Sequence, residues 1–415
     1  MERLDNSKLT PLQKHIVEEI ANGHKVAIVG GPGTGKTVLA MSGMGLSNDK
    51  KQILLTYSKP LSSMIHGCNV KFCTTFHSFC WTLGARIEKI LQDYSYEYEF
   101  DDDCNSIFNN VITREYGYTK GSQWPQLEKL TKAFNRLTDE QKKDVMYDDI
   151  FVDEAQDLPP EAFDFLKLLC NRMVVTYDEA QAVGSENDST VLTSKPVRKV
   201  GAECNEILRK LSLEDSFYDL IDNFRNTVAI ERVAKLFYNN YEANNYSLRE
   251  VATGRPEGSS PKVLFDGLSQ QLFDQIADDC YQLNKQVGVI VPDLLSYKQA
   301  RDRLNIAISK GLLPQEKFFF KYGTEDNMNG GGDALNKTGV FLTTYQSSKG
   351  MEFDDVYILD CQKNLLQSAA DRNKFYVAIT RAKENLTFVF SCEYTQSFPV
   401  LNVIKQNENL FDLEK

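Results

Sequence analysis

The segment Lys25–Met41 reads KVAIVGGPGTGKTVLAM and combines three features of one fold. The short run Val26–Val29, rich in β-branched residues, is typical of a strand, and a helical pattern follows Lys36. Between them, Gly30–Thr37 matches the phosphate-loop pattern G-x-x-x-x-G-K-[ST] in the strand–loop–helix setting that this pattern requires. The sequence therefore predicts an α/β domain that binds a nucleoside triphosphate.

The residue types of this loop suit phosphate. Glycines let backbone N–H groups converge on phosphate oxygens, and the following helix adds its positive N-terminal end. Lys36 is expected to reach the β- and γ-phosphates, and the Thr37 hydroxyl to ligate Mg²⁺. The alternative is a glycine-rich turn that arose by chance. The candidate nucleotide-binding residues are Gly30, Gly31, Pro32, Gly33, Thr34, Gly35, Lys36 and Thr37.

A second polar segment, FVDEAQDLPP at Phe151–Pro160, follows the apolar run and ends it abruptly. An apolar strand that ends in Asp-Glu is typical of a Walker B element. Asp153 would then hold Mg²⁺, and Glu154 would orient and polarise the attacking water. Gln156 and Asp157 are interpreted as links toward a second domain and the nucleic-acid strand path. The alternative is a solvated turn, because strands end at the surface.

Composition limits the class of protein. The chain has 415 residues, 42% hydrophobic and 25% charged, which is ordinary for a soluble protein of two or more domains. The scattered cysteines and four histidines suggest neither a zinc site nor a disulfide framework. No signal core or membrane span is evident, so a cytoplasmic location is expected. The net charge of −11 argues against blanket electrostatic binding to nucleic acid but leaves room for a local basic groove.

Several other polar residues are weak signals when each is taken alone. The Gln13 amide has the donor and acceptor that match the Hoogsteen edge of adenine, although a surface glutamine is the simpler reading. Arg225 and Arg381 lie at helix ends and could neutralise a γ-phosphate, or could form surface ion pairs. The loop with Lys349 and Glu352 could contact ligand or only connect two strands.

Taken together, these segments resemble a known family. LTPLQ, GGPGTGKT, ILLTYSKPL, TTFHSF, VDEAQD, DEAQ, DNFRN, TTYQSSKGMEFDDV and YVAITRAK occur in the order found in superfamily 1 helicases of the UvrD/Rep type. The resemblance runs from about Leu9 to Phe390. It implies two RecA-like P-loop domains with parallel sheets flanked by helices, which clamp ATP and Mg²⁺ between them while nucleic acid crosses their top surface.

The resemblance also implies roles for individual residues. Gln13 would read adenine and Phe224 would stack on it. Gln181 would couple the γ-phosphate to the strand-binding surface, and Arg225 and Arg381 would act as arginine fingers. Glu352 would contact ribose or the domain interface. The single-strand path would be lined by Tyr57, Ser58, Thr75, Phe76 and His77, although ordinary strand-end packing is an open alternative for Phe76.

Two positions depart from the family pattern. The run after Gln181, AVGSENDST, lacks the aromatic residues and the tryptophan that usually stack on a base there. This puts base-by-base stepping of the usual kind in doubt. Gln346 stands where the family commonly has histidine, a milder change because an amide can also bridge by hydrogen bonds.

Motif spacing predicts the domain layout. The first RecA-like domain is expected at residues 1–218, with a small helical insertion at about 82–145. The second is expected at residues 219–415, without the large accessory insertion of bigger family members.

Two functions remain open. The first is an ATP-dependent 3′-to-5′ translocase or helicase on single-stranded nucleic acid, with DNA favoured over RNA and the polarity taken from the resemblance. The second is a nucleic-acid-stimulated ATPase switch that regulates a partner, such as a nuclease, without unwinding. A P-loop small-molecule kinase would not explain the two distant arginine segments.

Overall fold

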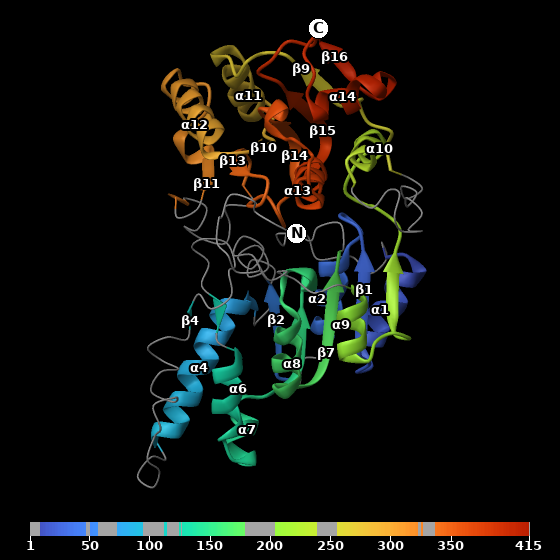
Figure 1. The fold of residues 1–415 in the computed structure, drawn as a ribbon, viewed down its shortest axis with the longest axis vertical. Coiled ribbons are helices and arrows are strands. Elements are labelled where there is room, and N and C mark those ends of the chain that lie inside the picture. Colours follow the sequence, from blue (N-terminus) through green and yellow to red (C-terminus); the bar gives the residue numbers. More distant parts are fainter. Residues whose placement is uncertain are drawn as a thin grey trace.

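The computed structural model describes residues 9–46, 50–56, 73–93, 112–113, 124–125, 127–178, 204–238, 255–322, 325–326 and 337–414. These residues form two lobes, each built on one large sheet (Figure 1). The first lobe comprises the described residues up to 220, and the second comprises those from 228 onward. Residues 221–227 form the connecting loop between them.

The first lobe contains a six-stranded sheet in the order β3-β2-β6-β7-β1-β8, with every neighbouring pair parallel. Its strands are β1 (Val26–Gly30), β2 (Gln52–Thr56), β3 (Cys73–Thr75), β6 (Tyr147–Val152), β7 (Cys170–Tyr177) and β8 (Phe217–Leu220). The helices are α1 (Pro11–Ala21), α2 (Lys36–Gly45), α4 (Phe76–Asp93), α6 (Leu127–Asn135), α7 (Asp139–Val145), α8 (Pro160–Leu168) and α9 (Cys204–Leu211). A short antiparallel pair, β4 (Ile112–Thr113) and β5 (Trp124–Pro125), forms a separate sheet.

The second lobe contains an eight-stranded sheet in the order β12-β11-β13-β10-β14-β15-β9-β16. Only the β11–β12 pair is antiparallel among these described strands. The strands are β9 (Lys262–Leu264), β10 (Gln286–Val291), β11 (Phe318–Tyr322), β12 (Glu325–Asp326), β13 (Gly339–Thr344), β14 (Phe353–Ile358), β15 (Ala382–Val389) and β16 (Asp412–Glu414). The helices are α10 (Val228–Leu236), α11 (Gln270–Gln282), α12 (Leu294–Ser309), α13 (Ala369–Ile379) and α14 (Pro399–Gln406).

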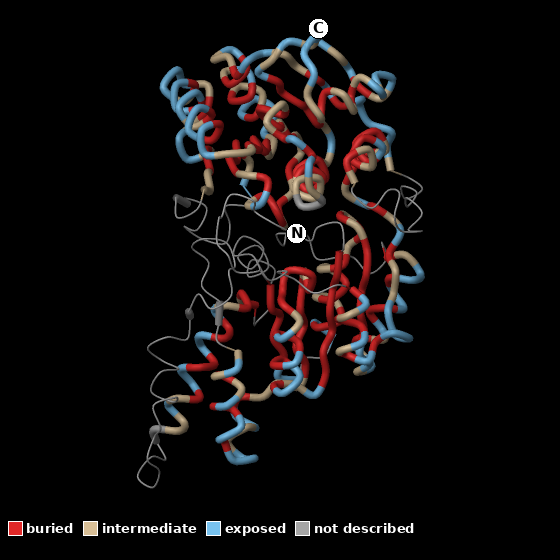
Figure 2. The backbone as a smooth tube through the Cα atoms, viewed as in Figure 1, coloured by how far each residue is buried: buried red, intermediate tan, exposed pale blue. Residues whose placement is uncertain are grey.

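Helices cover both faces of each sheet, which explains why the strands read as nearly continuous apolar runs. Along β1, Ala27 and Val29 pack with α4, α8 and α9, whereas Val26 and Ile28 pack with α1 and α2. Figure 2 shows buried residues along the strands of both lobes and exposed residues on the outer helices. The predicted fold class, two α/β P-loop domains with parallel sheets flanked by helices, is confirmed.

The arrangement of parallel strands also places the site. In an open α/β sheet, ligands bind in the crevice beyond the carboxyl ends of the strands. The phosphate loop follows β1, and Asp153 and Glu154 follow β6, so both motifs lie at this edge of the first sheet. The predicted domain boundary after residue 218 falls inside β8 and stays a prediction, as does the insertion at about 82–145, where α6, α7 and most of α4 lie. None of the described helices combines the length and apolarity needed to cross a bilayer.

Candidate functional site

The phosphate loop turns tightly between β1 and α2. Gly33 and Gly35 adopt positive φ angles of 73° and 89°, which favour glycine. The buried Lys36 ammonium donates to the carbonyl oxygens of Gly30 and Gly31, each at 2.8 Å, and lies 3.3 Å from Asp178 Oδ2. The loop therefore holds a positive charge inside its own curve, at the N-terminus of a helix.

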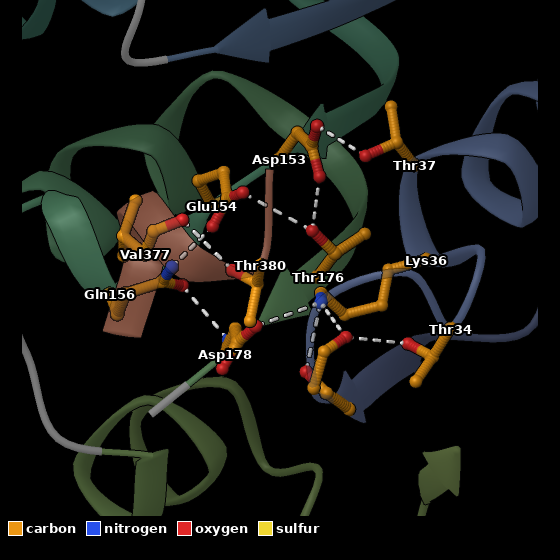
Figure 3. A network of polar contacts seen from close by, with 12 residues as sticks. Thr34, Lys36, Thr37, Asp153, Glu154, Gln156, Thr176, Asp178, Val377 and Thr380 are labelled. Carbon is orange, nitrogen blue, oxygen red and sulfur yellow. Dashed lines mark hydrogen bonds and ion pairs between the residues drawn. The ribbon is translucent and has the colours of Figure 1, made fainter. Parts of the chain in front are cut away.

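A hydroxyl and a carboxylate meet beside this loop. The Thr37 hydroxyl donates to Asp153 Oδ2 at 2.8 Å, and the Thr176 hydroxyl on β7 donates to Asp153 Oδ1 (Figure 3). Burial and the neighbouring charge of Glu154 raise the pKa of Asp153 to about 6. Mg²⁺ prefers one or two carboxylates together with hydroxyl, water and phosphate oxygens. Thr37 and Asp153 thus fit the predicted magnesium site.

Glu154 sits on a strained backbone immediately after β6. It adopts φ 56° and ψ 48°, a left-handed conformation that is uncommon for a residue with a side chain. Its N–H donates to Thr176 Oγ1 at 3.2 Å, and its carboxylate accepts from the Gln156 amide. Burial alone would raise the pKa of Glu154, but the ammonium groups of Lys349 and Lys36 lower it below its ordinary value. The side chain is therefore a fixed carboxylate that stays ionised.

The connecting loop brings Phe224 and Arg225 against the phosphate loop. The Phe224 N–H donates to Gly33 O at 2.9 Å, and the residue is 40% exposed, so its side chain is accessible to a ligand. Arg225 Nε donates to Glu352 Oε2 at 3.0 Å. Its Nη1 is buried and has no hydrogen-bond partner among the described residues, which fits a guanidinium placed for an anionic ligand.

Arg381 lies in the turn between α13 and β15 and is almost fully buried. Its nitrogens donate to Val377 O, Met351 O and Thr380 Oγ1. Burial and the nearby charge of Arg225 lower the pKa of Arg381 to about 9, against opposing effects of Glu154, Asp178 and Glu352. Arg381 therefore lies within electrostatic reach of both Arg225 and the Glu154 carboxylate.

Gln13 is buried beside the phosphate loop. Its Nε2 donates to Thr34 O at 3.3 Å, and its Oε1 accepts from the Thr10 N–H at 3.0 Å. With the Thr10 hydroxyl accepting from the Gln13 N–H, the second bond completes a capping box at the start of α1. The structure thus places Gln13 next to the nucleotide site with its amide already engaged, and its adenine-reading role stays a prediction.

The predicted strand-path residues are only partly within the described chain. Tyr57, Ser58 and Gln181 lie outside the described residues. Thr75 ends β3, and its hydroxyl pairs with that of Ser78 at 3.0 Å. Phe76 is fully buried in the hydrophobic core, so its ring packs there in this conformation. His77 is partly buried, and burial lowers its pKa, which keeps the imidazole neutral at pH 7.

Three contributors were not assigned from the sequence. Thr176 orients both Asp153 and Glu154, and a polar residue near the end of a buried strand beside β6 was a usable signal. Lys349 donates to both oxygens of Asp157, at 2.8 and 2.7 Å, and thereby joins the lobes. This contact agrees with the interpretation of Asp157 as a link toward the second domain, whereas the Gln156 side chain bonds to Glu154 and Asp178 within the first lobe, and a link to the strand path stays a prediction. Asn226 donates to Thr380 O at 3.2 Å, a contact that no local pattern signals.

Two protein-family models match parts of this chain. Residues 13–187 match a family model described as an AAA domain, and residues 326–393 match one described as a UvrD-like helicase C-terminal domain. Together these matches cover more than half of the chain. No curated protein matches it. Among solved structures, the C-terminal domain of a possible DNA helicase from Lactobacillus plantarum WCFS1 is similar at 22% identity, over 46% of this chain and 99% of that chain, with a TM-score of 0.31.

Proposed function

Because this chain belongs to the UvrD-like helicases, we propose that it is an ATP-driven motor that moves along single-stranded nucleic acid, with DNA as its substrate. Family membership indicates ATP-dependent helicase activity in general. The Mg-ATP site, the DNA substrate and 3′-to-5′ movement are the proposed refinements. A cytoplasmic location and a protein partner such as a nuclease belong to the proposal as well.

The contact between the connecting loop and the phosphate loop is the observation that carries this proposal. Phe224 touches Gly33, and one buried Arg225 nitrogen, next to the glycines of the phosphate loop, has no hydrogen-bond partner in the part of the chain that the structure describes. A phosphate that bound to this loop would meet a guanidinium supplied from outside the first lobe. Nucleotide binding and the placement of the second lobe would therefore depend on each other.

The chain's own groups can be assigned to the steps of hydrolysis. Lys36 and the backbone N–H groups of the phosphate loop would bind the β- and γ-phosphates. Thr37 and Asp153 would hold Mg²⁺, which supplies charge neutralisation when bound. Glu154 would orient the attacking water, and Arg225 and Arg381 would stabilise charge on the transferring phosphoryl group. Phe224 would stack on adenine with its accessible side chain.

The strand path is proposed along the same edge of the first sheet. Thr75 and His77 lie where β3 ends and α4 begins, and Tyr57 and Ser58 directly follow β2 in the sequence. Hydroxyl and imidazole groups at such positions can bind phosphates without reading sequence. ATP binding would draw the lobes together and hydrolysis would release them, so that alternating grip advances the strand.

One sequence observation favours a second candidate, a nucleic-acid-responsive ATPase switch. Residues 182–190 contain no aromatic side chain to stack on bases, and the net charge is −11. A chain with weak grip on bases could still use strand binding to set its ATPase rate and signal to a partner.

An unwinding assay separates the two candidates. Duplexes with a 3′ or a 5′ single-stranded tail, in DNA and in RNA, are incubated with Mg-ATP and the wild-type chain, with Glu154→Gln as the matched control. The motor predicts unwinding of the 3′-tailed DNA only, and none by the control. ATPase stimulation without unwinding would favour the switch, and no response to any polynucleotide would contradict both.

A further inference from the structure

One side chain of the second lobe reaches into the catalytic carboxylates of the first. Lys349 belongs to the loop between β13 and β14, and its side chain is 7% exposed. Its ammonium binds both oxygens of Asp157, at 2.8 and 2.7 Å, and lies 3.6 Å from Glu154 Oε2. It therefore contacts the residue proposed to orient the attacking water and the residue three positions after it.

Both sides of this contact are held rigidly. On the second lobe, Ser348 N donates to Thr344 O at 2.9 Å, and Phe353 N donates to Arg381 O at 2.9 Å, which fixes the loop at both ends. On the first lobe, Asp157 N donates to Glu154 O at 3.0 Å within a single 3₁₀ turn. The backbone that carries each side of this contact is thus hydrogen-bonded within its own lobe, and the Lys349–Glu154 distance depends on how the two lobes meet.

Lys349 brings a positive charge to a cluster of carboxylates in the first lobe. Asp153, Glu154 and Asp157 place three carboxylates within five residues, two of them buried and that of Glu154 12% exposed, so that their negative charges repel one another. The Lys36 ammonium already donates to Gly30 O and Gly31 O and lies 3.3 Å from Asp178. The second lobe therefore places an ammonium group against the Glu154 carboxylate, 3.6 Å from its Oε2.

We propose that Lys349 is a positioning residue for hydrolysis: anchored on Asp157, it holds the Glu154 carboxylate in place for the attacking water only while the two lobes are together. This inference rests on the proposed ATPase function. It makes the catalytic site of the first lobe incomplete without the second, so that hydrolysis depends on lobe closure through a named contact. Separation of the lobes would remove the ammonium and leave Glu154 less well placed.

Two variants and a control test the proposal through ATP turnover. Lys349→Met should lower kcat by about 10²-fold, the loss that a 1 Å misplacement can cause, with little change in KM for ATP. Because that variant leaves Asp157 buried without its partner, it can also lose stability. The double variant Lys349→Met with Asp157→Leu removes both charges together and should fold. The control, Lys285→Met, removes another lysine that is paired with carboxylates, Asp355 and Glu384, in the second sheet.

The double variant distinguishes two roles of Lys349: positioning of the Glu154 carboxylate, and a contact that only holds the two lobes together. Positioning predicts that it melts near the wild-type temperature but keeps the low kcat and the nearly unchanged KM, while Lys285→Met hydrolyses ATP at the wild-type rate. If the double variant regains the wild-type kcat, the Lys349–Asp157 contact only holds the lobes together, and the inference is overturned. Wild-type chain that fails to hydrolyse ATP would overturn the proposed function itself, and this inference with it.

Discussion

At the scale of single residues, adjacent carboxylates differ because their partners differ. Asp153 is held by two hydroxyls, and burial together with the charge of Glu154 raises its pKa to about 6. Glu154 faces ammonium groups that lower its pKa despite burial. These two neighbours in the sequence thus have different surroundings, which agrees with the different roles proposed for them.

Glu154→Gln tests the second of these roles. Glutamine keeps the shape and a hydrogen-bonding oxygen but cannot remain a charged acceptor for the attacking water. We expect Mg-ATP binding to persist and turnover to fall by roughly 10²- to 10⁴-fold, the usual contribution of a general base. Equilibrium binding of a fluorescent ATP analogue and a phosphate-release assay measure the two quantities. Turnover at the wild-type rate would remove Glu154 from its assigned role.

Arg225→Ala and Arg381→Ala should each lower kcat far more than they raise KM, because their charges oppose charge that develops in the transition state. The two variants should differ in stability. Arg381 is buried and donates to Val377 O and Met351 O, so its loss leaves buried acceptors unsatisfied and should lower Tm more. Steady-state kinetics and thermal melting check this. The control is Arg232→Ala, because Arg232 forms an exposed ion pair with Glu257. If kcat is unchanged in Arg225→Ala or in Arg381→Ala, the substituted arginine has only a structural role.

Residues within a contiguous motif could be predicted, whereas their tertiary partners could not. Lys36, Thr37, Asp153 and Glu154 were assigned from local patterns that fix residue types at fixed offsets. Lys349 contacts Asp157 across 192 positions, and no local pattern encodes such a separation. Tertiary contacts of this kind require the fold.

At the scale of elements, the connecting loop is held in place by two amides. Asn223 Oδ1 accepts from the N–H groups of Arg225 and Asn226, at 2.9 and 3.2 Å. The Asn226 amide donates to the carbonyl oxygens of Thr380 and Ala382, on either side of Arg381. The loop that carries one predicted arginine finger is thereby bonded to the turn that carries the other.

Gly33→Ala tests how closely the phosphate loop and the connecting loop fit. A Cβ at this position would lie 2.3 Å from Asn223 Oδ1 and 2.7 Å from Arg225 Cβ, and φ is +73°. The left-handed backbone alone costs an L-residue about 1–2 kcal/mol, and relief of the clash would displace Arg225. We expect a lower Tm and a lower kcat. Gly31→Ala is the control: a Cβ there has no heavy atom within 4 Å, so its Tm should equal that of the wild type. Equal Tm values for Gly33→Ala and Gly31→Ala would contradict the close approach of the two loops at Gly33.

Arg172→Met tests what fixes β6 against β7. Arg172 binds Asp149 through two bonds, of 2.7 and 2.6 Å, and both side chains are buried. Removing the guanidinium leaves a buried carboxylate with only the Gln52 amide and the exposed Lys50 as partners, at a cost of up to about 3–5 kcal/mol in unfolding free energy. Urea unfolding at pH 7 measures this. The control is Lys262→Met, because Lys262 forms an exposed pair with Glu414, and its loss should lower the unfolding free energy by at most about 1 kcal/mol. A similar loss of unfolding free energy in both variants would contradict the claim that burial makes the Arg172–Asp149 pair important for stability.

The same variant has a defined pH dependence. Burial alone would raise the pKa of Asp149, but its bonds with Arg172 and Gln52 lower it below its ordinary value. A depressed pKa stabilises the folded state above the unfolded value of about 3.9, and this contribution is lost as the pH falls through the folded pKa. The stability difference between wild type and Arg172→Met should therefore narrow in acid; a difference that widened there would contradict this.

Strands could be predicted from apolar runs because parallel strands buried on both faces need apolar side chains at nearly every position. The phosphate-loop helix was equally evident from its motif. The role of Gln13 could not be predicted in the same way, because this residue fits two sequence patterns. In LTPLQ it suits adenine, yet the same Thr10-x-x-Gln13 spacing makes a capping box, which the structure contains.

At the scale of the whole molecule, two α/β lobes meet through a few named contacts. Phe224 contacts Gly33 of the phosphate loop, Arg225 contacts Glu352, and Lys349 contacts Asp157 shortly after β6. The pairing of two such lobes could be predicted from the order of motifs along the chain. The contacts between them could not, because motif order does not determine how the lobes face each other.

The central claim is that nucleic acid controls ATP turnover in this two-lobed site. The most direct measurement compares the steady-state Mg-ATPase rate of the wild-type chain with and without saturating oligo-dT, at low salt so that phosphate contacts are not screened. The account predicts a clear rise in kcat with the oligonucleotide, and no such rise in Glu154→Gln. A wild-type rate that is the same with oligo-dT, with RNA and with neither would contradict it.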